Sequence, residues 1–270
     1  MNTNPFKTAA QIGLARCDGF TLVELTVVLG VIAVFVAVQL PARAVARGQT
    51  KIAQCAGNLR QIGLASQIYA NENNNRLPLL VGSATWVWDV PATAANGLLK
   101  YGPVKSTFYC PGTAPRFTDL QNWQDVSAPE RNLWDFGDGD GINGGFHVIG
   151  YSLAFSGSAS RLSSTNQNTT MLAESIQYQA GFLPAPVPSA RVLAADATIS
   201  ESSSDHQGPA VNSYDFNQVF GGFYLPQVSP HLNGSIPAGG NVGFKDGHVA
   251  WRNFQAMDER AAATSAGFWW

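Results

Sequence analysis

Residues 20–40 read FTLVELTVVLGVIAVFVAVQL, an apolar run of 21 residues whose only ionisable side chain is Glu24. As an α-helix rising about 1.5 Å per residue, the run would be roughly 31 Å long, which matches the hydrocarbon core of a bilayer. A helix buried in a soluble core rarely stays this apolar for so long. The run therefore predicts a transmembrane helix over residues 20–40, with a buried hydrophobic helix as the alternative.

An apolar stripe continues the helical pattern beyond this run. Its small and apolar members recur at steps of three and four residues, as on one face of an α-helix, and they are Ile52, Cys55, Leu59, Ile62, Ser66 and Tyr69. Pro41 predicts a kink, because it removes a hydrogen bond and crowds the preceding turn. The Asn-rich residues 71–75 end the helix. Residues 41–72 should therefore form an amphipathic helix that continues from the membrane.

The rest of the chain, residues 73–270, carries short β-like runs between turn clusters. The clearest hairpin is residues 241–252, NVGFKDGHVAWR, in which Asp246 and Gly247 form a dipeptide typical of two-residue type I′ turns. Counting outward from that turn places four apolar side chains on one buried face, those of Val242, Phe244, Val249 and Trp251. Residues 73–270 are thus expected to be a mostly antiparallel β-rich head, on which the amphipathic helix packs.

The composition argues against nucleic-acid binding. Charged residues make up 13% of the 270, and the formal net charge is −2. Ordinary soluble domains carry roughly 25% charged residues. A chain so poor in charge does not offer the basic face that phosphate binding requires.

Metal and catalytic motifs are weak. Asp135, Asp138 and Asp140 crowd a Gly-rich loop, and carboxylates at such spacing can hold Ca²⁺. However, Ile142 takes the place of an expected ligand and no Glu closes the loop, which favours a solvated turn. The four histidines lack metal-ligand spacing, and no nucleophile and base are paired by a motif. We therefore predict no catalytic residue, no metal and no cofactor.

The junction at residues 19–24, GFTLVE, has a stronger signal. It resembles the class III signal peptide of type IV pilins and type II secretion pseudopilins. The resemblance implies that a prepilin peptidase cuts after Gly19 and methylates Phe20. It also implies that Glu24 pairs with the terminal amine of a neighbouring subunit. The alternative is that Glu24 has no partner and its side chain reaches the membrane–water interface. A carboxylate inside a membrane is a functional candidate because its burial is costly.

The similarity covers three further segments, residues 55–78, 109–112 and 239–251. The last resembles a C-terminal signature of pseudopilin-like proteins in which nine residues separate a His from an Asp-Gly pair. Here His231 stands 14 residues before Asp246 and Gly247. The hairpin is expected to persist, while a fixed contact between His231 and Asp246 stays open.

The implied fold class is α+β and pilin-like, with a long N-terminal helix whose first half is transmembrane, packed on the mostly antiparallel β-rich C-terminal head. Residues 1–19 would be a cytoplasmic leader. The protein would cross the inner membrane once, with its head in the periplasm or outside the cell, and would enter a filament. The implied partners are the prepilin peptidase, other pilin or pseudopilin subunits, the inner-membrane assembly platform and membrane lipid.

The expected function is structural and not enzymatic: a processed subunit that polymerises into a pilus or a type II secretion pseudopilus. The alternative is a membrane-anchored extracytoplasmic protein that uses the same export route and binds a surface or a polysaccharide.

The cysteines fit an exported chain. Cys17 would leave with the leader, and Cys55 and Cys110 would remain as an even number in an oxidising compartment. They form either a bridge between helix and head or two buried free thiols. A bridge needs Cα atoms closer than about 7 Å, which a sequence does not reveal.

Overall fold

The computed structural model describes the following residues: 19–81, 86–114, 117–118, 133–134, 145–157, 162, 164–174, 176–178, 181–183, 186–201, 214–219, 226–262 and 266–270. For residues 38–45 it describes the helical backbone alone. The chain divides into two compact units, Met1–Ala46 and Arg47–Trp270. Most of the predicted leader and the Asp-rich loop with Asp135, Asp138 and Asp140 lie outside the described residues.

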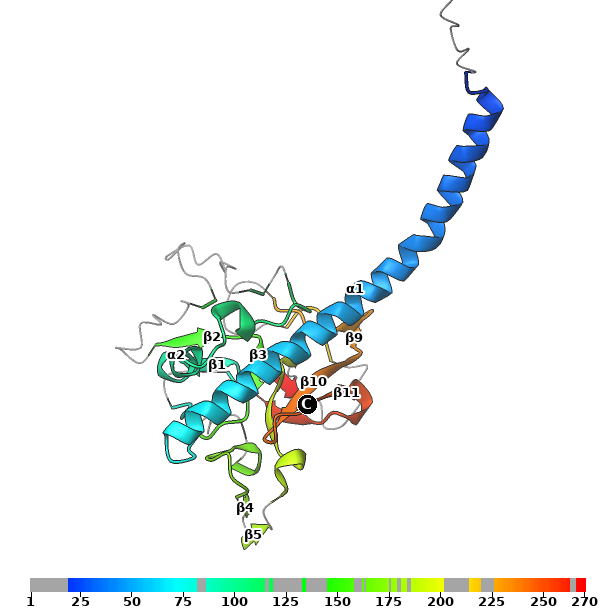
Figure 1. Ribbon diagram of the computed structural model, residues 1–270. Helices are drawn as coiled ribbons and strands as arrows, with labels where there is room; N and C mark the ends of the chain where they lie inside the picture. The colour runs from blue at the N-terminus through cyan, green and yellow to red at the C-terminus, as the bar shows by residue number, and fades with distance from the viewer. Residues whose placement is uncertain are drawn as a thin grey trace, which may run out of the picture. The chain divides into compact units, whose positions relative to one another are not determined.

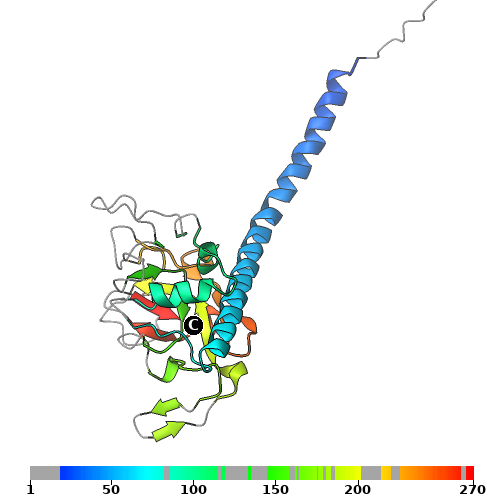
Figure 2. The ribbon, with the colours of Figure 1, turned by 60° about the vertical axis from the view of Figure 1, so that its left-hand side comes forward.

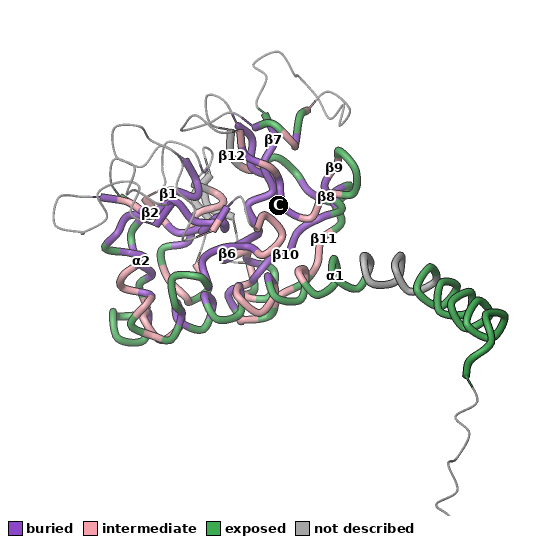
Figure 3. The backbone as a smooth tube through the Cα atoms, turned by 90° about the horizontal axis from the view of Figure 1, so that it is seen from above, coloured by how far each residue is buried: buried purple, intermediate pink, exposed green. Residues whose placement is uncertain are grey.

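The longest element is α1, which runs from Leu22 to Glu72 and has 51 residues. Side chains at residues 22–37 are all exposed and are apolar or small except at two positions (Figure 3). The helix ends as predicted in the Asn-rich segment, where Asn74 and Asn75 take left-handed φ angles of 53° and 61°. Asparagine tolerates this conformation, which is why it ends helices. The predicted kink at Pro41 falls among residues whose side chains are not described.

In the second unit, the part of α1 from residue 47 onward uses the predicted stripe. Cys55, Leu59, Ile62 and Ser66 are buried, and Ile52 and Tyr69 at its ends are half-buried. Figures 1 and 2 show this part of the helix lying along one side of the strands. The stripe prediction is confirmed because a single apolar face needs a single covering surface.

The remaining elements are short. The strands are β1 (Asp89–Pro91), β2 (Phe146–Val148), β3 (Tyr151–Leu153), β4 (Ile176–Tyr178), β5 (Gly181–Leu183), β6 (Val192–Asp196), β7 (Thr198–Glu201), β8 (Leu232–Asn233), β9 (Ile236–Pro237), β10 (Gly239–Phe244), β11 (Val249–Asn253), β12 (Glu259–Ala262) and β13 (Ala266–Trp269). The helices after α1 are α2 (Ala92–Leu99) and the 3-10 helices η1 (Lys105–Phe108), η2 (Ser164–Asn166), η3 (Pro188–Ala190) and η5 (Phe254–Ala256).

The strands pair antiparallel in small sheets. One has four strands in the order β11-β10-β6-β3, another has three in the order β12-β13-β7, and the pairs β1-β2, β4-β5 and β8-β9 are separate. The four-stranded sheet contacts α1: the side-chain amide of Asn241 on β10 donates to the Ile52 carbonyl at 3.1 Å. Just after β10, the Lys245 carbonyl accepts a hydrogen bond from the Gln67 side chain at 3.3 Å. Strands β6 and β10 are the buried centre of this sheet (Figure 3).

The hairpin register differs from the prediction by one residue. Asn241 pairs with Trp251 and Gly243 with Val249, so that Val242 stands on the opposite face from Val249. The turn is longer than two residues, because the Phe244 amide donates to the His248 carbonyl at 2.9 Å. The predicted common face of Val242, Phe244, Val249 and Trp251 is therefore wrong.

The predicted fold class, pilin-like with a transmembrane first half, is also wrong as stated. Within the residues that the structure describes, no helix is long and apolar enough to cross a membrane. Beyond α1, the described elements are short helices and mostly antiparallel strands. The transmembrane assignment of residues 20–40 and the single-pass inner-membrane location with an external head are corrected accordingly.

Candidate functional site

A disulfide joins the second half of α1 to the loop after η1. Cys55 and Cys110 are bonded through their sulfurs, with Cα atoms 5.3 Å apart. Both residues are buried. The loop can reach the helix because Gly150 passes close to it: a Cβ on Gly150 would lie 2.8 Å from the Cys110 backbone nitrogen. Of the two alternatives left open by the sequence, the structure contains the bridge and not the free thiols.

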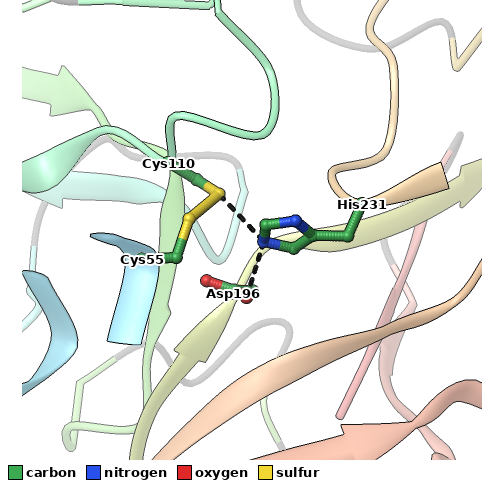
Figure 4. Close-up of side chains that lie close together, drawn as sticks. All are labelled: Cys55, Cys110, Asp196 and His231. Atoms are coloured by element: carbon green, nitrogen blue, oxygen red, sulfur yellow. Dashed lines mark hydrogen bonds and ion pairs between the residues drawn. A yellow bond between two sulfur atoms is a disulfide. The ribbon is translucent and has the colours of Figure 1, made fainter. Parts of the chain in front are cut away.

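A histidine and an aspartate adjoin this disulfide (Figure 4). His231 Nε2 lies 3.3 Å from Cys110 Sγ and 3.2 Å from Asp196 Oδ2. The side chains of His231 and Asp196 are 3% and 0% exposed. Trp251 packs against the imidazole in a T-shaped arrangement, with ring centroids 5.5 Å apart. These contacts, made by buried side chains, hold the imidazole in one orientation.

The pairing of β6 with β10 positions Asp196. Its Oδ2 accepts hydrogen bonds from the backbone amide of Asn241 at 2.7 Å and from the side-chain amide of Asn241 at 3.0 Å. The other oxygen, Oδ1, is buried and has no hydrogen-bond partner among the described residues. A buried carboxylate oxygen without a partner is unusual, because its desolvation is not compensated.

Asp196 also affects Tyr151 on the neighbouring strand β3. Burial, and then the proximity of Asp196, raises the pKa of the Tyr151 phenol well above its usual range. The phenol oxygen accepts a hydrogen bond from Asn58 on α1 at 3.0 Å. Helix, sheet and the Cys110 loop therefore meet around one polar cluster.

The predicted signature residues separate in space. Asp246 and Gly247 form the hairpin turn, where Asp246 Oδ1 accepts from the His248 amide at 3.1 Å and contacts His248 Nδ1 at 2.6 Å. His231 instead contacts Asp196, a residue that sequence reasoning missed. Asp196 carries one signal that could have found it: it is the charged end of the apolar strand VLAAD.

The predicted processing and assembly residues lie at the start of α1. Gly19 and Phe20 are exposed. Thr21 and Glu24 form a capping box: the Thr21 amide and hydroxyl donate to Glu24 Oε2 at 2.9 and 2.7 Å, and the Glu24 amide donates to Thr21 Oγ1 at 3.2 Å. The side-chain hydrogen bond from Thr21, followed by that from its backbone, lowers the pKa of the Glu24 carboxyl. The T-x-x-E spacing was a signal for this cap.

No family model, no curated protein and no solved structure matches the chain. The comparisons therefore add no support for the resemblance to pseudopilins, and the description of the chain as a transmembrane pseudopilin is corrected by the absence of a membrane-spanning helix in the described residues.

Proposed function

We propose that the chain is a structural subunit of a helical filament, processed after Gly19 by a prepilin-type peptidase and assembled through the N-terminal half of α1. One observation carries the proposal: the large apolar side chains between Leu22 and Val36 are 46% to 77% exposed. They surround the helix, because residues 22–37 contain only Glu24 and Thr26 as polar residues.

A helix that is apolar on all sides is stable only when it is surrounded. One flat partner covers one face, whereas a bundle of identical helices from neighbouring copies covers every face. Burying a side chain such as Ile32 or Phe35 contributes about 1.5–3 kcal/mol. Repeated along the helix, this burial favours polymerisation of the chain through residues 22–37.

Glu24 would have a second role in such a bundle. Cleavage after Gly19 creates a positive amine on Phe20, and the amine of one copy can pair with Glu24 of the next. Opposite charges brought together in a low-dielectric bundle compensate for desolvation that neither tolerates alone. The capping box gives Glu24 a competing role within its own helix, so the experiment must separate the two roles.

The processing step is tested by mass spectrometry of the mature protein. We expect a chain that begins with N-methylated Phe20. Gly19→Val should leave the uncut chain, because a β-branched side chain next to the scissile bond hinders the peptidase. Gly13→Val is the matched control and should be processed normally. Normal maturation of Gly19→Val would contradict the proposal.

The assembly step is tested by sedimentation and electron microscopy of filaments in the producing cells. Glu24→Gln keeps a side-chain oxygen for Thr21 but loses the charge, and we expect its filament yield to fall at least tenfold with normal processing. Thr21→Val removes the hydroxyl of the cap and keeps the charge, and it should still assemble. The reverse result, assembly of Glu24→Gln and failure of Thr21→Val, would assign Glu24 to capping and refute the charge pairing.

A further inference from the structure

Four side chains with metal-binding donor atoms meet in one buried place of the second unit. They are Cys55, Cys110, Asp196 and His231, and one donor atom from each lies within 4.8 Å of the others (Figure 4). They come from α1, the loop after η1, β6 and the turn before β8. In the oxidised chain the two sulfurs are bonded to each other and are not available as ligands.

We propose that these four side chains bind a divalent transition-metal ion of the zinc type when Cys55 and Cys110 are reduced, so that the disulfide and the ion are alternative occupants of one site. A thiol or phosphine reductant supplies two electrons and is itself oxidised, the S–S bond breaks, and each sulfur takes up one proton. Ion binding then releases the two thiol protons and forms two metal–sulfur bonds. The charge of the ion does not change.

The distances suit a tetrahedral ion. With zinc–sulfur and zinc–nitrogen bonds of about 2.3 and 2.0 Å, tetrahedral donor atoms lie roughly 3.3–3.8 Å apart. His231 Nε2 is already 3.3 Å from Cys110 Sγ and 3.2 Å from Asp196 Oδ2. The main change required is separation of the two sulfurs, which reduction of the bridge permits.

The neighbouring groups would support a bound ion. The Gly112 amide donates to Cys110 Sγ at 3.3 Å, and hydrogen bonds to sulfur stabilise a ligating thiolate. Asn241 holds Asp196 in place through two hydrogen bonds to Oδ2. Partners that orient a ligand in this way strengthen metal sites. The buried Oδ1 of Asp196, which has no hydrogen-bond partner within the described ranges, would gain compensation from a nearby cation.

The donor set also selects the kind of ion. Two sulfurs, one imidazole nitrogen and one carboxylate oxygen are the ligands of zinc and related transition metals in tetrahedral sites. Ca²⁺ and Mg²⁺ require six or more oxygen ligands, including waters, which this enclosed cluster does not offer. The site is therefore selective against hard cations such as Ca²⁺, which the sequence analysis considered for the Asp-rich loop.

The test uses the full chain and cobalt as a visible probe. After anaerobic reduction with a phosphine, Co²⁺ should bind in one equivalent, with thiolate-to-cobalt charge-transfer absorption and the d–d bands of a tetrahedral ion, and Zn²⁺ should displace it. The oxidised chain should show none of these bands. X-ray absorption of the zinc-loaded reduced chain should give two sulfur and two nitrogen or oxygen donors. Absence of the charge-transfer band, or a different donor shell, would overturn the proposal.

Variants test the two ligands that are not cysteines. Asp196→Asn and His231→Gln should weaken Co²⁺ binding at least tenfold. Asp246→Asn and His248→Gln are matched controls, because they alter the exposed His–Asp pair of the hairpin, and they should bind as the unaltered chain does. Circular dichroism reports whether each variant folds. Where a variant does not fold, the donor shell seen by X-ray absorption of the unaltered chain tests the site instead. Unchanged binding by folded Asp196→Asn and His231→Gln would refute the four-ligand site.

Discussion

The two halves of α1 have the same backbone and opposite surroundings. At residues 22–37 every side chain is exposed, whereas at residues 55–70 the side chains of one face are buried. The first half is apolar on all sides, and the second is apolar along one stripe. A stripe is satisfied by one surface of the same chain, while an all-round apolar helix needs several neighbours. The comparison teaches that helix formation and helix burial are separate requirements.

Polar groups mark the same difference. In the second half, Asn58 reaches across to the Tyr109 carbonyl at 3.1 Å and Ser66 bonds back to the Ile62 carbonyl at 2.8 Å. In the first half, Thr26 and Glu24 bond only within their own turn among the interactions described. The second half is tied to the fold by polar contacts as well as by burial.

Removing the disulfide should have the largest effect on the second half. Cys55 and Cys110 are separated by 55 residues, and the chain-entropy relation assigns roughly 4 kcal/mol of stability to a loop of this length. We expect the Cys55→Ser, Cys110→Ser double variant to lose about this much in urea unfolding with a chelator present. Cys17→Ser should be unaffected. An unchanged midpoint in the double variant would mean that the bridge does not tie α1 to the sheets in solution.

A matched pair of truncations in one helix comes next in size. Ile62 is 0% exposed and Ile32 is 51% exposed. Ile62→Ala should lower the free energy of unfolding by about 3 kcal/mol, because it removes buried methylene groups and leaves a cavity. Ile32→Ala in the unassembled chain should change it by less than about 0.5 kcal/mol. Equal losses, measured by urea unfolding, would break the distinction between the two halves.

The contact between Asn58 and Tyr151 gives the smallest effect, and it depends on pH. Tyr151→Phe should cost about 1 kcal/mol at neutral pH, because a buried hydrogen bond is lost. Since burial raises the pKa of the Tyr151 phenol in the folded chain, its contribution is fully present below about pH 10 and is lost as the pH rises through the higher folded pKa. Between pH 8 and 12, the free energy of unfolding of Tyr151→Phe should fall less steeply above pH 10 than that of the unaltered chain. If the free energy of unfolding fell equally steeply with pH in both proteins, groups other than Tyr151 would account for the loss of stability at alkaline pH.

Local patterns predicted the helix well. The spacing of the stripe identified the buried positions from Cys55 to Ser66, and the Asn-rich segment identified the end of α1. These features depend on the 3.6-residue periodicity of a helix and on the backbone preferences of asparagine. Both can be recognised from residues that are close together in the sequence. The hairpin turn was located for the same reason, but its register was not, because the turn is longer than two residues and is closed by the hydrogen bond from the Phe244 amide to the His248 carbonyl.

Contacts between distant residues were beyond the reach of the sequence. Cysteine counting narrowed the bridge to Cys55 and Cys110, yet their approach to 5.3 Å depends on how the Cys110 loop passes Gly150. Nothing in the sequence pairs His231 with Asp196, which stand on separate elements. Asp196 ends β6 in the four-stranded sheet, whereas His231 precedes β8 in a separate two-stranded pair and takes a left-handed φ of 55°.

The sequence by itself determined a 51-residue helix, its apolar first half and its striped second half, because side chains close along the chain set helical periodicity and exposed area. Only the tertiary structure decided which cysteine, histidine and aspartate share a site and which hairpin face is buried. The physical reason is that burial and side-chain proximity depend on the pairing of strands distant in sequence, and short, irregular strands carry little pattern that specifies their partners.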